Sequence, residues 1–112
     1  MNRRDFKKII DKRVEYIYAT ITGSKNKEYA SEEDVFHNFY LAGRMMGVEP
    51  EKALLFFKAK HDVSIQDIID KLPDIVDQKV YKEKIGDIIN YMFLLEGLLD
   101  ERYNNQDRKH KL

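Results

Sequence analysis

The sequence predicts an all-α protein, folded as a compact bundle of four to five helices. The chain has 112 residues, a common size for one domain that buries its own core. Its apolar residues recur at steps of three and four along several segments, which is the helical period, and none of these segments alternates as a strand does. Hydrophobic residues make up 43% of the chain and charged residues 36%, a mixture that favours amphipathic helices with solvated outer faces.

The first half of the chain predicts two helices joined by a loop. The first helix is expected over residues 3–22, because its apolar residues fall three or four apart. Residues 23–30 are rich in turn formers and predict a connecting loop, which is also a candidate site loop. Ser31 is a candidate N-cap for the second helix, with Asp34 three residues on, and Gly47 ends that helix.

Three further helices are expected in the second half. Pro50 fits the first turn of a third helix, which runs to about His61 and is expected to be the most buried. Ser64 can cap a short fourth helix, which Pro73 stops. The last and longest helix is expected over residues 78–103, with its apolar side chains on one stripe.

Composition also predicts the domain organisation and the compartment. We expect a single helical domain over residues 1–104 and a polar, frayed tail over residues 105–112. The absence of cysteine excludes disulfides and thiol chemistry. The formal net charge is zero, which argues against binding of nucleic acid. The charged N-terminus and the lack of a long apolar segment predict a cytoplasmic protein that does not bind membranes.

Polar residues on the predicted second helix form two candidate pairs. Glu33 and His37 are four residues apart, as are Asp34 and Asn38, so each pair shares a helix face. Such pairs are common on any charged helix, and a solvated face is therefore the simpler interpretation. The alternative is that these side chains face a ligand.

The predicted last helix carries a similar group. Glu83 and Asp87 are four apart, and Asn90 follows three residues later inside an apolar run. Two antiparallel helices that present such groups to each other can surround Mg²⁺, which prefers carboxylate oxygens. A partly buried Asp87 needs a metal or a partner, and the simpler interpretation is an ion pair with Lys or Arg across a helix interface.

Cationic and aromatic side chains offer further ligand contacts. Lys60 and His61 would end the third helix, where they either complement the helix dipole or hold phosphate oxygens. Tyr29, in the predicted loop, is a candidate to stack on a base. Most aromatic residues of the helices are expected in the core: Phe36, Phe39, Tyr40, Phe56 and Phe57.

Three stretches resemble known proteins. KEYASEEDVFHNF at residues 27–39 resembles a segment of small phage and prophage proteins of the nucleotide modification associated domain group, and EKIGDIINY at 83–91 resembles their closing helix. KHDVSI at 60–65 is similar to an element between these two segments in some members. The last-helix segment also resembles the MazG-like nucleoside triphosphate pyrophosphohydrolases, which are all-α, usually oligomeric, Mg²⁺-dependent enzymes.

The resemblance implies a MazG-like all-α fold and a phage-type protein that handles a nucleotide or a nucleotide-derived small molecule, in the host cytoplasm if phage-encoded. It implies Mg²⁺ as a cofactor and a pyrophosphohydrolase activity. The implied catalytic carboxylates are Glu33, Asp34, Glu83 and Asp87, of which Asp34, Glu83 and Asp87 would hold the metal. The implied ligand-binding residues are Lys27, Tyr29, His37, Asn38, Lys60, His61, Asn90 and Tyr91.

The sequence departs from the MazG-like pattern at two positions. Lys84 stands where those enzymes have a Glu three residues before Asp87, and Asn38 stands where a second carboxylate is expected. Two alternatives to hydrolysis therefore stay open, namely a non-catalytic binder of a nucleotide or nucleotide-derived signal, and a helical oligomeric interaction protein. The apolar content of the helices further predicts a homodimer or higher homo-oligomer.

Overall fold

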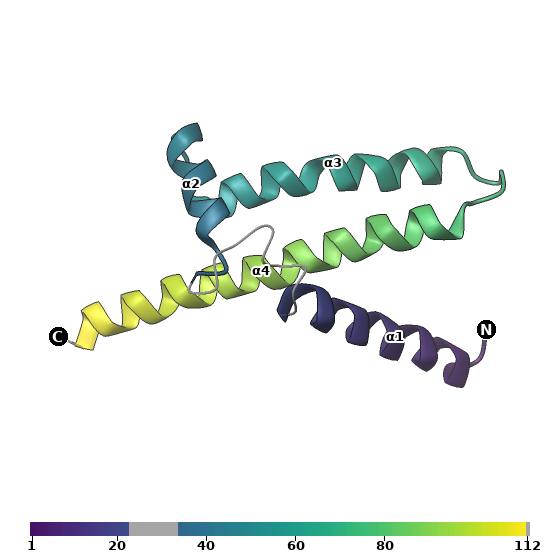
Figure 1. The fold of residues 1–112 in the computed structure, drawn as a ribbon, viewed down its shortest axis with the longest axis horizontal. Coiled ribbons are helices and arrows are strands. Elements are labelled where there is room, and N and C mark those ends of the chain that lie inside the picture. The colour runs from purple at the N-terminus through teal and green to yellow at the C-terminus, as the bar shows by residue number, and fades with distance from the viewer. Residues whose placement is uncertain (23–33, 112) are drawn as a thin grey trace. The chain divides into compact units, whose positions relative to one another are not determined.

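The structure is a computed structural model that describes residues 1–22 and 34–111, with side chains up to residue 106. These residues form four helices and no strand, which confirms the all-α prediction (Figure 1). The chain divides into two units, residues 1–35 and 36–112, and each is described by itself. A single domain over residues 1–104 stays a prediction. The helices are α1 (Arg3–Thr22), α2 (His37–Met46), α3 (Pro50–Asp70) and α4 (Gln78–Lys111).

The first unit consists of α1, whose bounds match the predicted helix. Asn2 caps its start, because the Asn2 Oδ1 accepts a hydrogen bond of 2.8 Å from the backbone N–H of Asp5. Ile17 is buried, whereas Phe6 and Val14 are more than half exposed. The predicted loop over residues 23–30, the Ser31 cap and three candidate site residues lie outside the described residues: Lys27, Tyr29 and Glu33.

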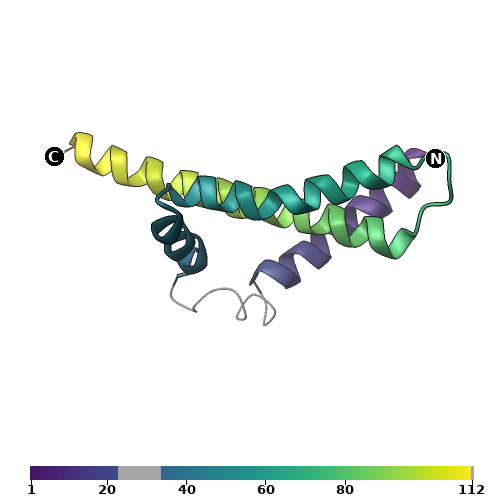
Figure 2. The same cartoon turned by 90° about the horizontal axis from the view of Figure 1, so that it is seen from above.

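The second unit is built on a helical hairpin. Helices α3 and α4 lie side by side in both views, joined by a turn, and α2 lies against the start of α3 (Figures 1 and 2). The buried core consists of Phe39 from α2, Leu54 from α3 and Leu98 from α4. Partly buried residues surround it: Phe36, Tyr40, Tyr91, Leu94 and Leu95. One residue from each helix therefore meets at the end of the hairpin where α2 packs.

Helix α2 begins later than predicted. Asp34 is not helical, and the helix starts at His37 after a turn. The carbonyl of Phe36 accepts the N–H groups of Phe39 and Tyr40 at 3.0 and 3.1 Å. The Phe36 ring lies so close to α4 that a Cβ atom on Gly97 would be 2.6 Å from it. Helix α2 thus starts directly after Phe36, the residue that packs against α4. The sequence pattern at Ser31 and Asp34 predicts an earlier start.

The end of α2 and the start of α3 agree with the sequence. Gly47 has a φ of 70°, the left-handed conformation that favours glycine after a helix, and Val48 donates to the carbonyl of Gly43 at 2.9 Å. A Cβ atom on Gly43 would lie 2.7 Å from the Val48 carbonyl oxygen, so this tight turn needs glycine there as well. Pro50 occupies the first turn of α3, where its missing N–H costs nothing.

The predicted third and fourth helices are one helix. Ser64 does not cap a new helix, because its hydroxyl donates to the Lys60 carbonyl at 2.9 Å within a continuous α3. No Gly or Pro interrupts the chain between Pro50 and Pro73. The prediction of a helix end near His61 is therefore wrong. Lys60 and His61 lie within α3, so they do not complement the dipole at its C-terminus.

Two further expectations about the hairpin are corrected. Helix α4 continues to Lys111, so the predicted end at Tyr103 is too early, and no Gly or Pro after Gly97 would stop it. Helix α3 has more buried residues than any other described helix, as predicted, but Phe56 and Phe57, which were expected in the core, are 68% and 37% exposed and lie outside it. In the described part of the chain, no helix is long and apolar enough to span a membrane.

Candidate functional site

The middle of the α3–α4 hairpin brings together four residues that the sequence singles out. His61 of α3 lies beside Asp87 of α4, with 3.3 Å between His61 Nδ1 and Asp87 Oδ2. The ring of Tyr91 lies 5.5 Å from the His61 ring, centre to centre, at 39°. Asn90 shares this part of α4 and has a buried Oδ1. We name these four residues the His61 group.

The helical period explains why α4 supplies three of them. Asp87, Asn90 and Tyr91 are three and four residues apart, so they lie along one face over a single turn. Tyr91 packs against the core on that face, and its ring also contacts Phe39 at 6.4 Å. This face of α4 is therefore turned toward α3. The alternative that Asp87 pairs with Lys or Arg across a helix interface is not what the structure has, since the side chain that lies 3.3 Å from its carboxylate across the interface is His61.

The surroundings of His61 favour an uncharged imidazole. Only 11% of its side chain is exposed, and burial lowers the pKa of His61 below its ordinary value of 6.5. The charge of Asp87 opposes this shift, whereas the nearby charges of Lys60 and Lys84 add to it. At neutral pH the imidazole is neutral, with one ring nitrogen free to accept a hydrogen bond.

Two buried atoms of the His61 group make no hydrogen bond within the described part of the chain. They are His61 Nδ1, which lies near Asp87 but without hydrogen-bond geometry, and Asn90 Oδ1. A buried polar atom without a partner costs about 1–3 kcal/mol. Most buried polar groups of folded proteins are paired, so each of these two atoms is a candidate to form a hydrogen bond with a ligand.

The other predicted site residues of the second unit lie around or apart from this group. Lys60 and Glu83 are exposed and adjoin it on α3 and α4. His37 and Asn38 are exposed in the first turn of α2. Asp34 belongs to the first unit, whose position relative to the second is not described.

The predicted Mg²⁺ ligands are only partly present in the second unit. It supplies Glu83 and Asp87, which lie one turn apart on α4. Among the residues whose side chains are described, no three acidic or histidine groups lie close enough to hold a metal ion. Two carboxylates alone fall short of a protein-made Mg²⁺ site, and the remaining ligands would have to be substrate phosphates and water.

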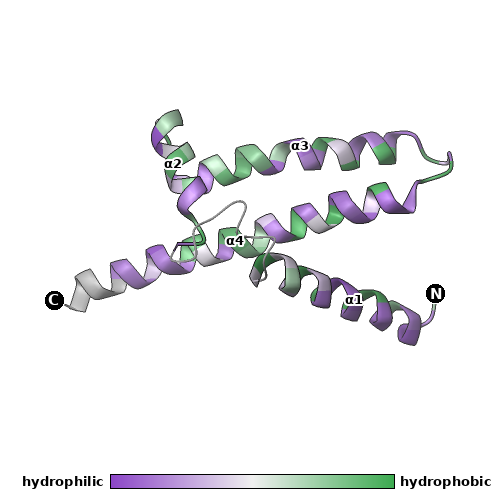
Figure 3. Ribbon diagram, in the orientation of Figure 1, coloured by the Kyte–Doolittle hydropathy of each residue, from purple (hydrophilic) through white to green (hydrophobic). Residues whose placement is uncertain are grey.

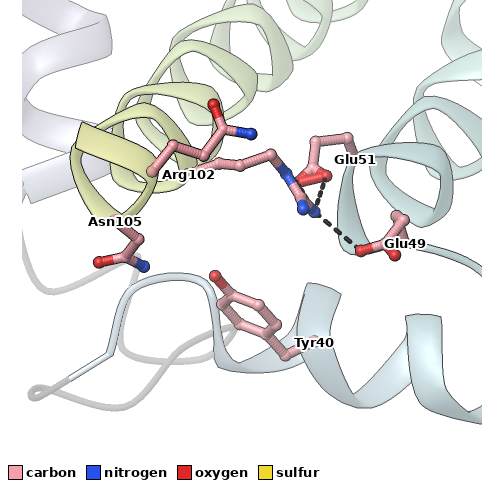
Figure 4. Close-up of a pocket in the computed structure, with 6 residues that line it drawn as sticks. Tyr40, Glu49, Glu51, Arg102 and Asn105 are labelled. Atoms are coloured by element: carbon pink, nitrogen blue, oxygen red, sulfur yellow. Dashed lines mark hydrogen bonds and ion pairs between the residues drawn. The ribbon is translucent and has the colours of Figure 1, made fainter. Parts of the chain in front are cut away.

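The sequence gives no sign of a second polar cluster, at the end of the hairpin where α2 packs. Arg102 of α4 bonds Glu51 through two nitrogens, at 3.2 Å from Nε and 2.8 Å from Nη2, and Nη2 also bonds Glu49 at 2.8 Å (Figure 4). These hydrogen bonds raise the pKa of Arg102, with Glu51 the larger cause. The Tyr40 hydroxyl donates to Glu101 nearby. No spacing rule connects residues so far apart in sequence.

Arg102, its two glutamate partners and Tyr40 help to line an open cavity of about 350 Å³. Its walls come from all three helices of the second unit: Tyr40, Glu49, Glu51, Arg102, Asn105 and Gln106. The charges that line it already bond one another, as Figure 4 shows. The charged side chains at this cavity therefore connect α4 to the start of α3 by hydrogen bonds. The His61 group differs, because two of its buried atoms are unpaired.

Three comparisons, with protein-family models, with curated proteins and with solved structures, found no match for this chain. The likeness to phage nucleotide-handling proteins and to MazG-like enzymes thus remains a hypothesis that rests on the three sequence stretches.

Proposed function

We propose that this chain is a nucleotide-handling protein, similar to nucleoside triphosphate pyrophosphohydrolases, and that the His61 group forms part of its ligand site. One observation carries the proposal. Two of the stretches that resemble the same protein group, residues 60–65 and 83–91, are distant in sequence, yet His61 and Asp87 lie 3.3 Å apart. The unpaired buried atoms of His61 and Asn90 support a ligand rather than a purely structural contact.

The chemistry of the group suits a nucleotide. The Asn90 amide can accept from the amino groups of a base or from a ribose hydroxyl, and the neutral His61 can do the same. The positive charges of Lys60 and Lys84, close enough to lower the pKa of His61, would attract phosphate oxygens. Asp87 is 37% exposed and is the candidate to orient or deprotonate an attacking water.

A ligand screen with product analysis tests this proposal. The purified chain is heated with nucleoside mono-, di- and triphosphates and with cyclic nucleotides, each with and without Mg²⁺, and any stabilising ligand is then analysed for cleavage. We expect a rise in melting temperature with a triphosphate, together with release of pyrophosphate and the monophosphate. Asp87→Asn should abolish the cleavage while the helical circular dichroism signal is kept.

The matched control is Asp62→Asn, which removes a carboxylate of α3 that pairs with Lys58 at 2.9 Å. It should cleave like the original chain. A ligand that stabilises the chain but emerges intact would replace the hydrolase with the non-catalytic binder. No stabilisation by any nucleotide would refute both, and a fully active, folded Asp87→Asn would refute the assignment of Asp87.

A further inference from the structure

Helix α4 carries apolar side chains on a second face, away from α3. Ile85 is 40% exposed, and Met92 and Leu99 are each 48% exposed. Residues nine apart lie half a turn from each other on an α-helix, because each residue turns by about 100°. Ile85 is therefore opposite Leu94, and Leu99 is opposite Asn90, both of which belong to the face that meets α3. We name Ile85, Met92 and Leu99 the outer row.

The spacing of the outer row is that of a helix-pairing seam. Its three residues are seven apart, so they recur on nearly one line with about 10.5 Å between neighbours. Ile88 stands three residues after Ile85, as the second apolar position of a heptad does, whereas Leu95, three residues after Met92, packs against the core of the second unit. In Figure 3 green apolar and purple polar residues alternate along much of α4, and the stretch just before its grey end is purple.

The row is symmetric about its centre. Ile85 and Leu99 are equally far from Met92, so two antiparallel copies of α4 would place Met92 beside Met92 and each Ile85 beside the Leu99 of the other copy. Such a pairing buries the same surface on both chains, as a two-fold interface requires. A parallel pairing would bury the row too, and the charges decide between them.

The charges of α4 are unequal about Met92. Residues 78–88 carry three Lys against one Glu and one Asp, a net charge of +1. Residues 96–106, the mirror-image stretch, carry two Glu and one Asp against one Arg, a net charge of −2. An antiparallel pair sets the positive stretch beside the negative one and aligns the helix dipoles favourably, whereas a parallel pair sets like charges together.

We propose that a second copy of this chain covers the outer row, with the two α4 helices antiparallel about a two-fold axis at Met92. The interface lies on the face of α4 opposite the His61 group and leaves that group uncovered. The dimer is thus independent of the proposed nucleotide chemistry, and each can fail without the other.

Cysteine cross-linking tests the register, and the chain is suited to it because it has no cysteine of its own. Under mild oxidation the Met92→Cys chain should form a disulfide-linked dimer. Ile85→Cys and Leu99→Cys should each stay uncross-linked alone, because two equivalent positions lie about 14 residues apart along the helices, or about 21 Å. A mixture of these two variants should cross-link. Self-linking of Ile85→Cys would overturn the antiparallel arrangement.

Sedimentation at several concentrations tests the interface without a new covalent bond. We expect the full chain to be a dimer and Met92→Glu, which sets two carboxylates together at the axis, to be a folded monomer. The matched control is Phe56→Glu, the same kind of change at an exposed apolar residue of α3, and it should remain a dimer. A chain that stays monomeric at every concentration, or a dimer that Met92→Glu leaves intact, would overturn the proposal.

Discussion

The two polar clusters of the second unit join the same two helices in opposite ways. In the Arg102 cluster each charged group of the network has a partner, and the side chains of Arg102 and Glu49 are 43% and 67% exposed. In the His61 group the imidazole is 11% exposed, and two buried atoms have no hydrogen-bond partner within the described part of the chain. The charged groups of the Arg102 cluster are paired, whereas two buried atoms of the His61 group are not.

The difference separates a structural role from the functional role that we propose. Exposed ion pairs contribute little to stability, and the paired charges of the Arg102 cluster are explained by the contact that they make between α4 and the start of α3. Unpaired buried atoms reduce stability, and such a cost is typical of sites that bind a ligand. Under the proposed function, a substitution in the His61 group can therefore stabilise the fold while it weakens ligand binding.

The largest expected effect follows from Asn90→Leu. This change replaces a side chain that has an unpaired buried oxygen with an apolar one of similar shape, so we expect the free energy of unfolding to rise by about 1 kcal/mol. Urea unfolding measures it, and nucleotide-induced stabilisation should be lost in the same variant. Asn105→Leu, at the exposed Arg102 cavity, is the control and should bring no gain. A loss of stability in Asn90→Leu would mean that its amide is satisfied, and the contrast would disappear.

A smaller effect is expected from acid. Because the folded chain lowers the pKa of His61 below 6.5, protonation favours the unfolded chain. Above pH 6.5 the neutral imidazole makes its full contribution to the free energy of unfolding. This contribution declines as the pH falls through 6.5 toward the pKa of His61 in the folded chain. Urea midpoints between about pH 5 and 8 measure the decline. His61→Gln should remove the part of this decline that is due to His61, whereas the exposed His37→Gln should keep it. If the urea midpoint changes equally with pH in both variants and the original chain, the decline is not due to His61.

The smallest effect is expected from Arg102→Gln. Arg102 is 43% exposed and the two carboxylates that it bonds, Glu49 and Glu51, are 67% and 15% exposed, so the melting temperature should fall only slightly, and the difference from the original chain should shrink as salt is added. Arg44→Gln, an exposed arginine of α2, provides the comparison. A large fall in melting temperature that added salt does not reduce would mean that the Arg102 cluster contributes strongly to the stability of the hairpin.

Local signals in the sequence determine much of the fold. Helix α1 has the predicted bounds, Gly47 ends α2, Pro50 opens α3 and Gln78 opens α4, because glycine, proline and the apolar period act on the nearest residues. The histidine, aspartate, asparagine and tyrosine positions of the His61 group can likewise be selected from sequence. The sequence does not show which of these residues contact one another, because His61 and Asp87 stand on different helices.

The tertiary structure alone decides three points. Ser64 offers a cap, yet α3 continues through it, because one unbroken helix can pack along α4 from Leu54 to beyond His61. Arg102 meets Glu51 across 51 residues of sequence, which no local pattern encodes. The apolar period marks which residues of α4 are able to be buried, but only the position of α3 determines which of its two apolar faces is covered. Contacts between distant segments depend on how whole helices pack, and the pattern of neighbouring residues does not contain that information.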